Sequence, residues 1–212
     1  MKKFLSKKMM LLPPFEPFSM LFTENGTFEV PRGCKKLTVV LVGGGASAGR
    51  NSYHKPDIFN TYHITGGAGG SGAKVILEFT HQNMPSSFDF TVGQATTGLL
   101  QNGGDTSVTA DETTYTAGGG VKPYQCGGGD GDTTNFGGSG GTPNVEVGGV
   151  VIFAQNGTTG QAGGYRGGST ARTTGWEIDG TVYGSGGGQY GNSNAYGEYQ
   201  QGDAGCIFVI AE

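Results

Sequence analysis

Residues 37–49 read LTVVLVGGGASAG, an apolar strand pattern that passes directly into a run of small residues. The chain holds 44 glycines among its 212 residues, about three times the ~7 % of an average protein. Most of them stand in runs at 43–45, 66–72, 118–120, 127–131, 137–141, 163–168 and 184–188. Because glycine loses more backbone entropy on folding than other residues, such runs either stay disordered or fill a geometry without room for Cβ.

The sequence around the runs favours the ordered alternative. Apolar strand patterns bracket the runs at both ends, and the segments between them are rich in Tyr, Phe and Trp rather than in the residues of disordered chains. A strict G-X-Y repeat is absent, which excludes a collagen triple helix. Each glycine still carries one donor and one acceptor, so extended glycine helices can bond to each other through their main chains. A six-residue segment of such a helix spans about 19 Å.

The apolar patterns predict strands on both sides of the glycine runs. Residues 21–30 favour a hairpin around Asn25-Gly26, and residues 105–116 favour a second one around Asp111. Further strand patterns lie at 37–42, 73–79, 88–92 and 207–210, with an apolar stretch at 150–153. We therefore predict a mostly β fold with an irregular glycine-rich body and essentially no α-helix. The N-terminal strands and the C-terminal strand form a small sheet or sandwich, packed on a bundle of polyglycine type II helices.

Charge and cysteine content exclude several classes of protein. The formal net charge is −4 and no basic stripe is present, so we expect no nucleic-acid partner. Cys34, Cys126 and Cys206 are far apart without a C-x-x-C pair, which predicts three free thiols and no metal site. No stretch is long enough to span a membrane. We expect no cofactor.

The first 20 residues predict an attachment segment, followed by a glycine-rich domain at 21–212. Lys7 and Lys8 interrupt the apolar run and Pro13 ends it, which argues against a secretion signal. A short apolar peptide with prolines either folds back on its own domain or docks on another protein, and we expect docking. The residues expected to make this contact are apolar: Phe4, Leu5, Met9, Met10, Leu11, Leu12, Phe15 and Phe18.

Several motif matches lack the structural context that their chemistry needs. Residues 39–49 resemble a dinucleotide-binding turn, but no helix pattern follows to hold a pyrophosphate. Residues 137–141 match G-x-S-x-G without the strand before and helix after a nucleophile elbow. Cleavage of polysaccharide would need paired carboxylates in a groove, and the close acidic pairs in the second half are Glu177 with Asp179 and Asp130 with Asp132. We therefore expect a protein that is not an enzyme.

The order of short motifs resembles the glycine-rich domain of bacteriophage tail proteins. It is also similar to the receptor-binding adhesin at the tip of T-even-like long tail fibres. The motifs that carry the likeness are FTENGTFEVPRG at 22–33, LTVVLVGGG at 37–45, GGAGGSGA at 66–73, FTVG at 90–93, GGDTS at 103–107 and GCIFVIAE at 205–212. The resemblance implies a stack of polyglycine type II helices whose end loops contact the bacterial surface. It implies a virion protein, made in the bacterial cytoplasm, whose N-terminal part attaches to another tail or fibre protein.

Three segments between the runs, 50–65, 170–183 and 189–201, are the expected receptor-binding loops. They carry aromatic and small polar residues, the mixture that antibody binding loops use for contact area and adaptable hydrogen bonds. The alternative is that these rings cover the glycine block. A bacterial surface protein or polysaccharide is the expected receptor, and a purely structural virion protein that caps or decorates a tail, fibre or capsid is the alternative function. The expected contact residues are Tyr53, His54, Phe59, Tyr62, Trp176, Tyr183, Tyr190, Asn192 and Tyr196.

Overall fold

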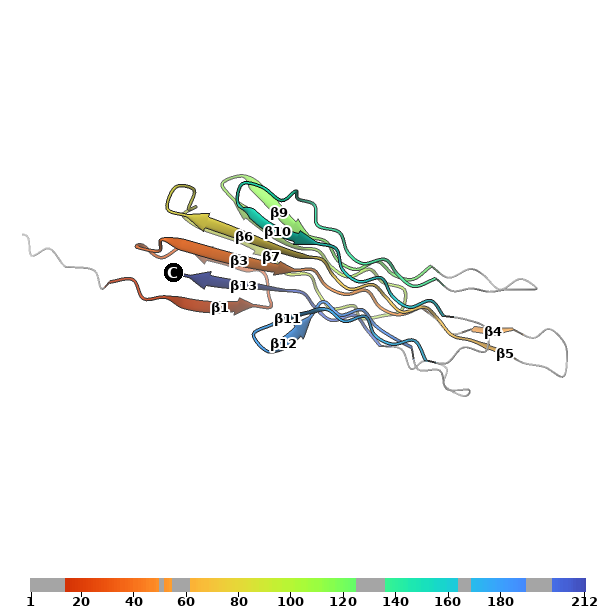
Figure 1. Ribbon diagram of the computed structural model, residues 1–212. Coiled ribbons are helices and arrows are strands. Elements are labelled where there is room, and N and C mark those ends of the chain that lie inside the picture. The colour runs from red at the N-terminus through yellow and green to blue at the C-terminus, as the bar shows by residue number, and fades with distance from the viewer. Residues whose placement is uncertain (1–13, 50–51, 55–61, 125–135, 164–168, 190–199) are drawn as a thin grey trace, which may run out of the picture.

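A computed structural model of the chain describes residues 14–49, 52–54, 62–124, 136–163, 169–189 and 200–212. Across these residues the fold is all-β, with antiparallel sheets and no helix, as the sequence predicts. The strands of two sheets gather near the C-terminus, and extended segments run away from them along the long axis of the molecule (Figure 1).

A five-stranded antiparallel sheet forms one layer, in the order β1-β13-β3-β6-β10. Its central strand β3 pairs with β13 and β6, so Val39 lies opposite both Val209 and Leu77. β-branched and aliphatic side chains dominate these strands, which suits a pleated surface that is covered. The strand bounds are Phe18–Phe22 for β1, Lys36–Val42 for β3, Lys74–Thr80 for β6, Val151–Gln155 for β10 and Cys206–Ala211 for β13.

A four-stranded antiparallel sheet, in the order β2-β7-β8-β9, forms the second layer. The predicted hairpin around Asp111 is confirmed: β8 and β9 are joined through Asp111 and Glu112, which have φ values of 44° and 68°. Positive φ at both central residues is the geometry of a tight hairpin turn, which Asp adopts more readily than most residues. The bounds are Gly26–Glu29 for β2, Ser87–Thr91 for β7, Thr106–Ala110 for β8 and Thr113–Ala117 for β9.

The predicted hairpin over 21–30 is wrong. β1 pairs with β13 and β2 pairs with β7, so the chain crosses from one sheet to the other at this turn. Phe22 and Phe28 face each other in the core from opposite layers, with ring centroids 6.0 Å apart. Asn25 does not stand in a hairpin turn; its side-chain Oδ1 instead accepts a hydrogen bond from Val92 N at 2.8 Å. Burial of the two rings therefore overrides the local turn signal.

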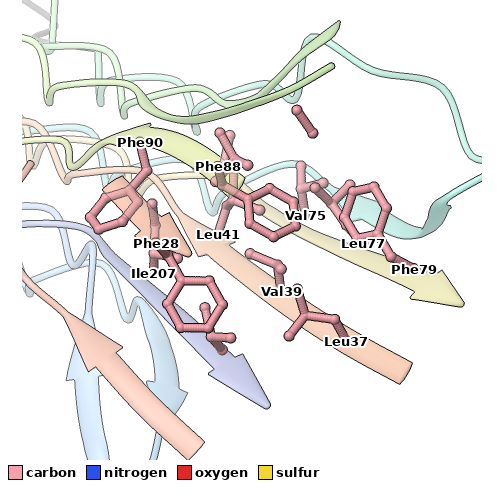
Figure 2. Packing of buried hydrophobic residues seen from close by; sticks show 14 of the residues in the cluster. Phe28, Leu37, Val39, Leu41, Val75, Leu77, Phe79, Phe88, Phe90 and Ile207 are labelled. Carbon is pink, nitrogen blue, oxygen red and sulfur yellow. The ribbon is translucent and has the colours of Figure 1, made fainter. Parts of the chain in front are cut away.

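The main hydrophobic core lies between the two sheets (Figure 2). Alternate residues of β3, Leu37, Val39 and Leu41, are at most 1 % exposed. Phe88 and Phe90 reach the same core from β7, and the Phe79 and Phe88 rings lie 5.2 Å apart. The predicted small sandwich is thus confirmed, and the C-terminal strand β13 is part of it.

A short hairpin covers the outer face of the five-stranded sheet. It consists of β11, Trp176–Ile178, and β12, Thr181–Tyr183, joined by Asp179 and Gly180 at positive φ. Ile178 packs with Val40 and Val42 of β3 in a second buried cluster. β3 is therefore buried on both faces, which explains its continuous apolar sequence.

Glycine-rich segments continue the strands of both sheets. We call them the glycine body: residues 43–49, 65–73, 93–105, 118–124, 136–143, 156–163, 169–175, 184–189 and 200–205. Segment 43–49 follows β3 directly, 65–73 leads into β6, and 200–205 leads into β13. Figure 1 shows these segments side by side beyond the sandwich.

Backbone hydrogen bonds join the segments in a three-residue repeat. Along 43–49, every third amide donates to the same neighbouring segment, so one segment has three bonded neighbours. The amides of Gly43, Ala46 and Gly49 donate to the carbonyls of Ala73, Gly70 and Gly67, respectively. Those of Gly44 and Ser47 donate to Gly104 and Gln101, and those of Gly45 and Ala48 donate to Asp203 and Gln200. These N···O distances run from 2.8 to 3.4 Å.

Close approach of these backbones explains why the residues are glycine. A Cβ at Gly45 would meet the carbonyl of Ser185, one at Gly70 that of Ser139, and one at Gly72 that of Gly43. All three lie well inside 3.0 Å, a separation that real Cβ atoms essentially never show. Among the glycines described in the body, Gly184 alone has a positive φ. The glycines of the body therefore serve close packing rather than unusual backbone angles.

Candidate functional site

The glycine body has one end at the sandwich and one end away from it, which we call the distal end. At the distal end Gly49 N donates to Gly67 O, and Thr170 and Gln189 exchange two backbone hydrogen bonds. Gln189 is 3 % exposed, and its Nε2 donates to Gly49 O. These contacts draw segments from four distant parts of the sequence into one place.

The described residues bring the ends of four chain connections together here. Segments 43–49 and 65–73 flank residues 50–64, and the bridge between Tyr124 and Phe136 closes residues 125–135. Thr170 and Gln189 form a bridge; in the sequence, Thr170 follows residues 164–168 and Gln189 precedes residues 190–199. A Cβ on Gly67 would meet Phe136 O, which places the second connection beside the first. The described residues that flank these four connections thus lie at the same end of the molecule.

Part of the first expected loop is a small hairpin. β4, Ser52–His54, pairs with β5, Tyr62–Ile64, so that Tyr53 lies opposite His63 and His54 opposite Tyr62. Figure 1 shows this hairpin at the distal end. Three expected contact residues, Tyr53, His54 and Tyr62, therefore belong to one two-stranded unit. The expected residues Phe59, Tyr190, Asn192 and Tyr196 lie outside the described residues.

The expected contact residues Trp176 and Tyr183 lie on a hairpin at the sheet. They lie on β11 and β12, directly opposite each other, against the outer face of the five-stranded sheet. Trp176 Nε1 donates to Gly72 O at 2.8 Å, and Lys74 Nζ lies 5.5 Å from its ring centroid. Both rings therefore pack on the five-stranded sheet, and the Trp176 indole also bonds to the glycine body at Gly72.

Two of the expected attachment residues pack on the domain itself. Phe15 and Phe18 lie against the main core, and the Phe18 ring is 6.3 Å from that of Phe28. β1 also crosses the expected boundary between residues 20 and 21. The folded domain therefore includes residues from at least Phe15 onward. The remaining attachment residues, Phe4, Leu5, Met9, Met10, Leu11 and Leu12, lie outside the described residues.

Two exposed aromatic residues at the distal end were missed by the sequence reasoning. Tyr124 and Phe136 form an isolated antiparallel bridge, and they are 69 % and 55 % exposed. The signal was present, because each ring stands at the margin of a glycine-rich stretch, as Tyr53 and Tyr190 do. Exposed aromatic residues at the root of a loop are suited to contact with another molecule.

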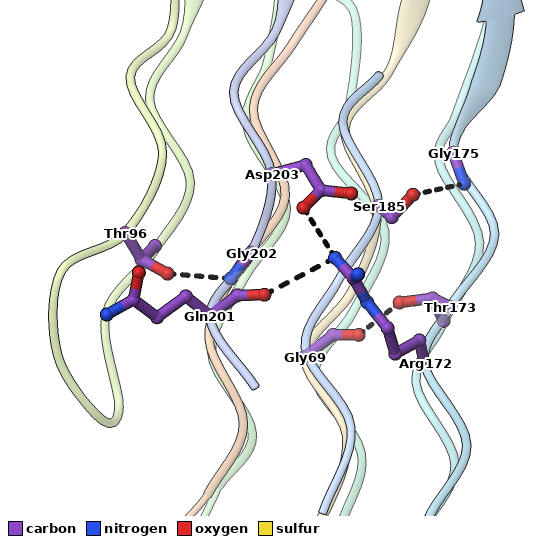
Figure 3. A network of polar contacts seen from close by, with 9 residues as sticks. All are labelled: Gly69, Thr96, Arg172, Thr173, Gly175, Ser185, Gln201, Gly202 and Asp203. Atoms are coloured by element: carbon purple, nitrogen blue, oxygen red, sulfur yellow. Dashed lines mark hydrogen bonds and ion pairs between the residues drawn. The ribbon is translucent and has the colours of Figure 1, made fainter. Parts of the chain in front are cut away.

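Polar side chains connect neighbouring segments of the glycine body (Figure 3). Arg172 pairs with Asp203 at 2.6 Å and also donates to the Gln201 carbonyl. Thr173 Oγ1 donates to Gly69 O, and Ser185 Oγ accepts from Gly175 N. Segments 169–175, 184–189 and 200–205 are thereby tied to each other by side chains as well as by their main chains.

Cys206 is a buried thiol rather than a reactive one. It is 0 % exposed within the second cluster, and this burial raises its pKa to about 12. Cys34 is also a free thiol, and Cys126 lies outside the described residues. Within the described ranges no three His, Cys, Asp or Glu side chains gather as metal ligands. Nor does that part of the chain contain a helix long and apolar enough to cross a membrane.

The family comparison agrees with this architecture. A family model described as a glycine-rich domain matches residues 23–206. The chain belongs to the glycine-rich domain family. The match begins in the turn between β1 and β2 and ends at the first residue of β13, so this glycine-rich domain includes both the sandwich strands and the glycine body. No curated protein matches the sequence of the chain.

Proposed function

We propose that this glycine-rich domain is a bacteriophage tail-fibre or tail-tip adhesin, which binds a bacterial surface receptor without catalysing a reaction. The observation that carries the proposal is that the described residues flanking four connections meet at the distal end. A rigid support that presents several loops side by side is the arrangement of a binding surface, because loops vary freely when a scaffold fixes their ends.

The glycine body supports this proposal as a scaffold. We interpret its three-residue hydrogen-bond repeat as that of polyglycine type II helices, which have about three residues per turn and an extended rise. The negative φ of most body glycines agrees with that conformation. Such a body keeps the distal end at a fixed distance from the sandwich, since each segment is bonded to several neighbours.

The residues proposed to contact the receptor belong to connections whose flanking residues meet at the distal end. They are Tyr53, His54 and Tyr62 of the β4–β5 unit, with Phe59, Tyr190, Asn192 and Tyr196 of the adjoining segments. Trp176 and Tyr183 are left out of this surface because they pack on the sheet. Residues 1–13 are proposed to attach to another virion protein, and the receptor is a bacterial surface protein or polysaccharide.

The proposal is tested by adsorption of virions to host bacteria. Virions carrying Tyr53→Ala with Tyr62→Ala, or Tyr190→Ala with Tyr196→Ala, should assemble normally but adsorb at least about tenfold more slowly, because aromatic residues dominate interface energies. The control is Val147→Ala, a site that is 65 % exposed and lies three residues before Val150, whose carbonyl accepts from Glu78 N in the sandwich. Normal adsorption by both double variants would refute the receptor role.

The alternative, a purely structural virion protein, predicts a different location on the particle. Gold-labelled antibody should mark the tip of the tail or its fibres if the domain is an adhesin. Labelling that repeats along a tail or over a capsid would favour the structural function instead.

A further inference from the structure

The five-stranded sheet has an open edge at β1. Among the strands that the structure describes, β1 pairs with β13 alone, from Phe18 opposite Ala211 to Phe22 opposite Ile207. Its other edge presents main-chain donors and acceptors to a further strand. Natural edge strands usually carry a charge, a proline or a bulge that prevents such pairing. Residues 18–22, FSMLF, contain no charge and no proline, and their register with β13 is regular.

The hydrophobic core is also incomplete beneath this edge. Phe18 and Phe22 face the core but are only partly buried, and Met20, on the same side of the strand, is 46 % exposed. On the neighbouring strand β13, Ile207 and Val209 are 1 % and 3 % exposed. The core-facing side chains of β13 are therefore buried, whereas those of the edge strand β1 are only partly covered. One more strand along β1 would cover these apolar side chains.

The sequence of β1 is complementary to itself in the antiparallel direction. When two copies pair with Met20 at the centre, Phe18 lies opposite Phe22 of the second copy, and Ser19 lies opposite Leu21. No charged residue meets another within the strand, and aromatic cross-strand pairs are favourable. A two-fold interface needs this reciprocity, in which residue i contacts residue j and residue j contacts residue i.

We propose that a second copy of the chain pairs with β1, strand to strand and antiparallel, so that two five-stranded sheets join across a two-fold axis at Met20. This dimer is independent of receptor binding, because β1 lies at the opposite end of the molecule from β4 and β5 (Figure 1). The same register brings Glu16 towards Glu24 of the second copy at each margin. Association therefore strengthens as salt screens these like charges.

A charge swap at the two-fold axis tests the proposal. Sedimentation equilibrium of the full chain should show a monomer–dimer equilibrium, and Met20→Lys or Met20→Glu alone should raise the dissociation constant by more than roughly tenfold, because like charges then face each other. An equimolar mixture of the two variants should restore dimers, since the opposite charges attract. Ile152→Lys is the matched control: this residue is 49 % exposed on β10, the opposite edge strand, and the substitution should leave the dimer intact.

Thermal unfolding of each variant separates loss of the dimer from loss of the fold. Should Met20→Lys fail to fold, the double variants S19K/L21K and S19E/L21E carry the same test on the other side of the strand. A wild-type chain that stays monomeric up to about 100 μM, above the Kd of most specific interfaces, would overturn the proposal. So would Met20 variants that dimerise like wild type, or a mixture that fails to restore dimers.

Discussion

The sandwich and the glycine body are built on opposite rules of packing. In the sandwich, large apolar side chains such as Leu37 and Leu41 fill the space between two sheets and are 0 % exposed. In the body, the backbones themselves approach so closely that a Cβ at Gly70 or Gly120 would meet a carbonyl of a neighbouring segment. Substitutions that remove buried atoms should therefore destabilise the sandwich, whereas substitutions that add atoms should destabilise the glycine body.

This difference also separates the sources of stability. Burial of apolar surface stabilises the sandwich, as in most globular domains. The body has few large buried side chains, so its segments are held mainly by hydrogen bonds between main chains, with Thr106 linking the two regions. Thr106 Oγ1 donates to Val42 O at 2.7 Å and accepts from Gly93 N at 2.9 Å. The continuity of strand and glycine segment lets one region align the other.

The largest expected effect comes from a cavity in the sandwich. Leu41→Ala should lower the free energy of unfolding by about 2–5 kcal/mol, because the side chain is fully buried and the two sheets cannot close around the gap. Urea denaturation followed by circular dichroism measures this change. A loss below ~1 kcal/mol would show that the space between the sheets is not tightly packed.

The converse substitution in the body should cost about 1–3 kcal/mol or more. Gly70→Ala adds one methyl group where only the Ser139 backbone is available to move, so the segments must separate and lose hydrogen bonds. Gly98→Ala is the matched control, since the nearest atoms to its Cβ belong to the flexible side chain of Gln101. Equal stability of the two variants in the same denaturation assay would contradict close packing in the body.

These two regions also differ in what the sequence predicts about them. The strands at 37–42, 73–79 and 88–92 were predicted because their apolar patterns match the period and length of buried strands. Pairing was predicted less well: Asn25-Gly26 signals a turn but does not say that the two flanking strands belong to different sheets. That choice depends on where Phe22 and Phe28 find a core, which is a property of the whole fold.

Sequence composition suggested which segments form the candidate site, but it did not show where each segment lies in the fold. Of the segment 50–65, the paired strands β4 and β5 lie at the distal end. Trp176 has the same polar and glycine-rich neighbours in sequence, yet it covers a sheet, because Ile178 two residues later anchors its strand on Val40 and Val42. The sequence did not predict which glycine segments bond to each other, because segments made of the same residue offer no side chains that distinguish one partner from another.

The reactivity of Cys206 reports on the junction between the sandwich and the glycine body, because Cys206 begins β13 directly after segment 200–205. With a pKa of about 12, the thiol stays protonated at pH 8, so labelling by iodoacetamide should be slower than for an ordinary thiol by about a thousandfold. Labelling should accelerate as the pH rises towards 12, and it should reach the ordinary rate once guanidinium unfolds the chain. Mass spectrometry of the peptide that contains Cys206 measures this rate. Rapid labelling of the folded chain at pH 8 would mean that the second cluster opens.

The smallest effect is expected from the ion pair on the side of the body. Asp203→Asn should change the free energy of unfolding by less than about 1 kcal/mol, because both partners of the Arg172 pair are roughly 40 % exposed and solvent screens them. Denaturation at low and high salt measures the effect. A larger loss would mean that this ion pair holds the segments together more strongly than an exposed ion pair ordinarily does.

Amide hydrogen exchange tests most directly whether main-chain hydrogen bonds make the glycine segments as rigid as the sheets. The amides of 43–49, each bonded to a neighbouring segment, should exchange as slowly as those of β3 in the same chain, within about an order of magnitude. Exchange of 43–49 at the rate of an unfolded peptide, while β3 stays protected, would contradict the account.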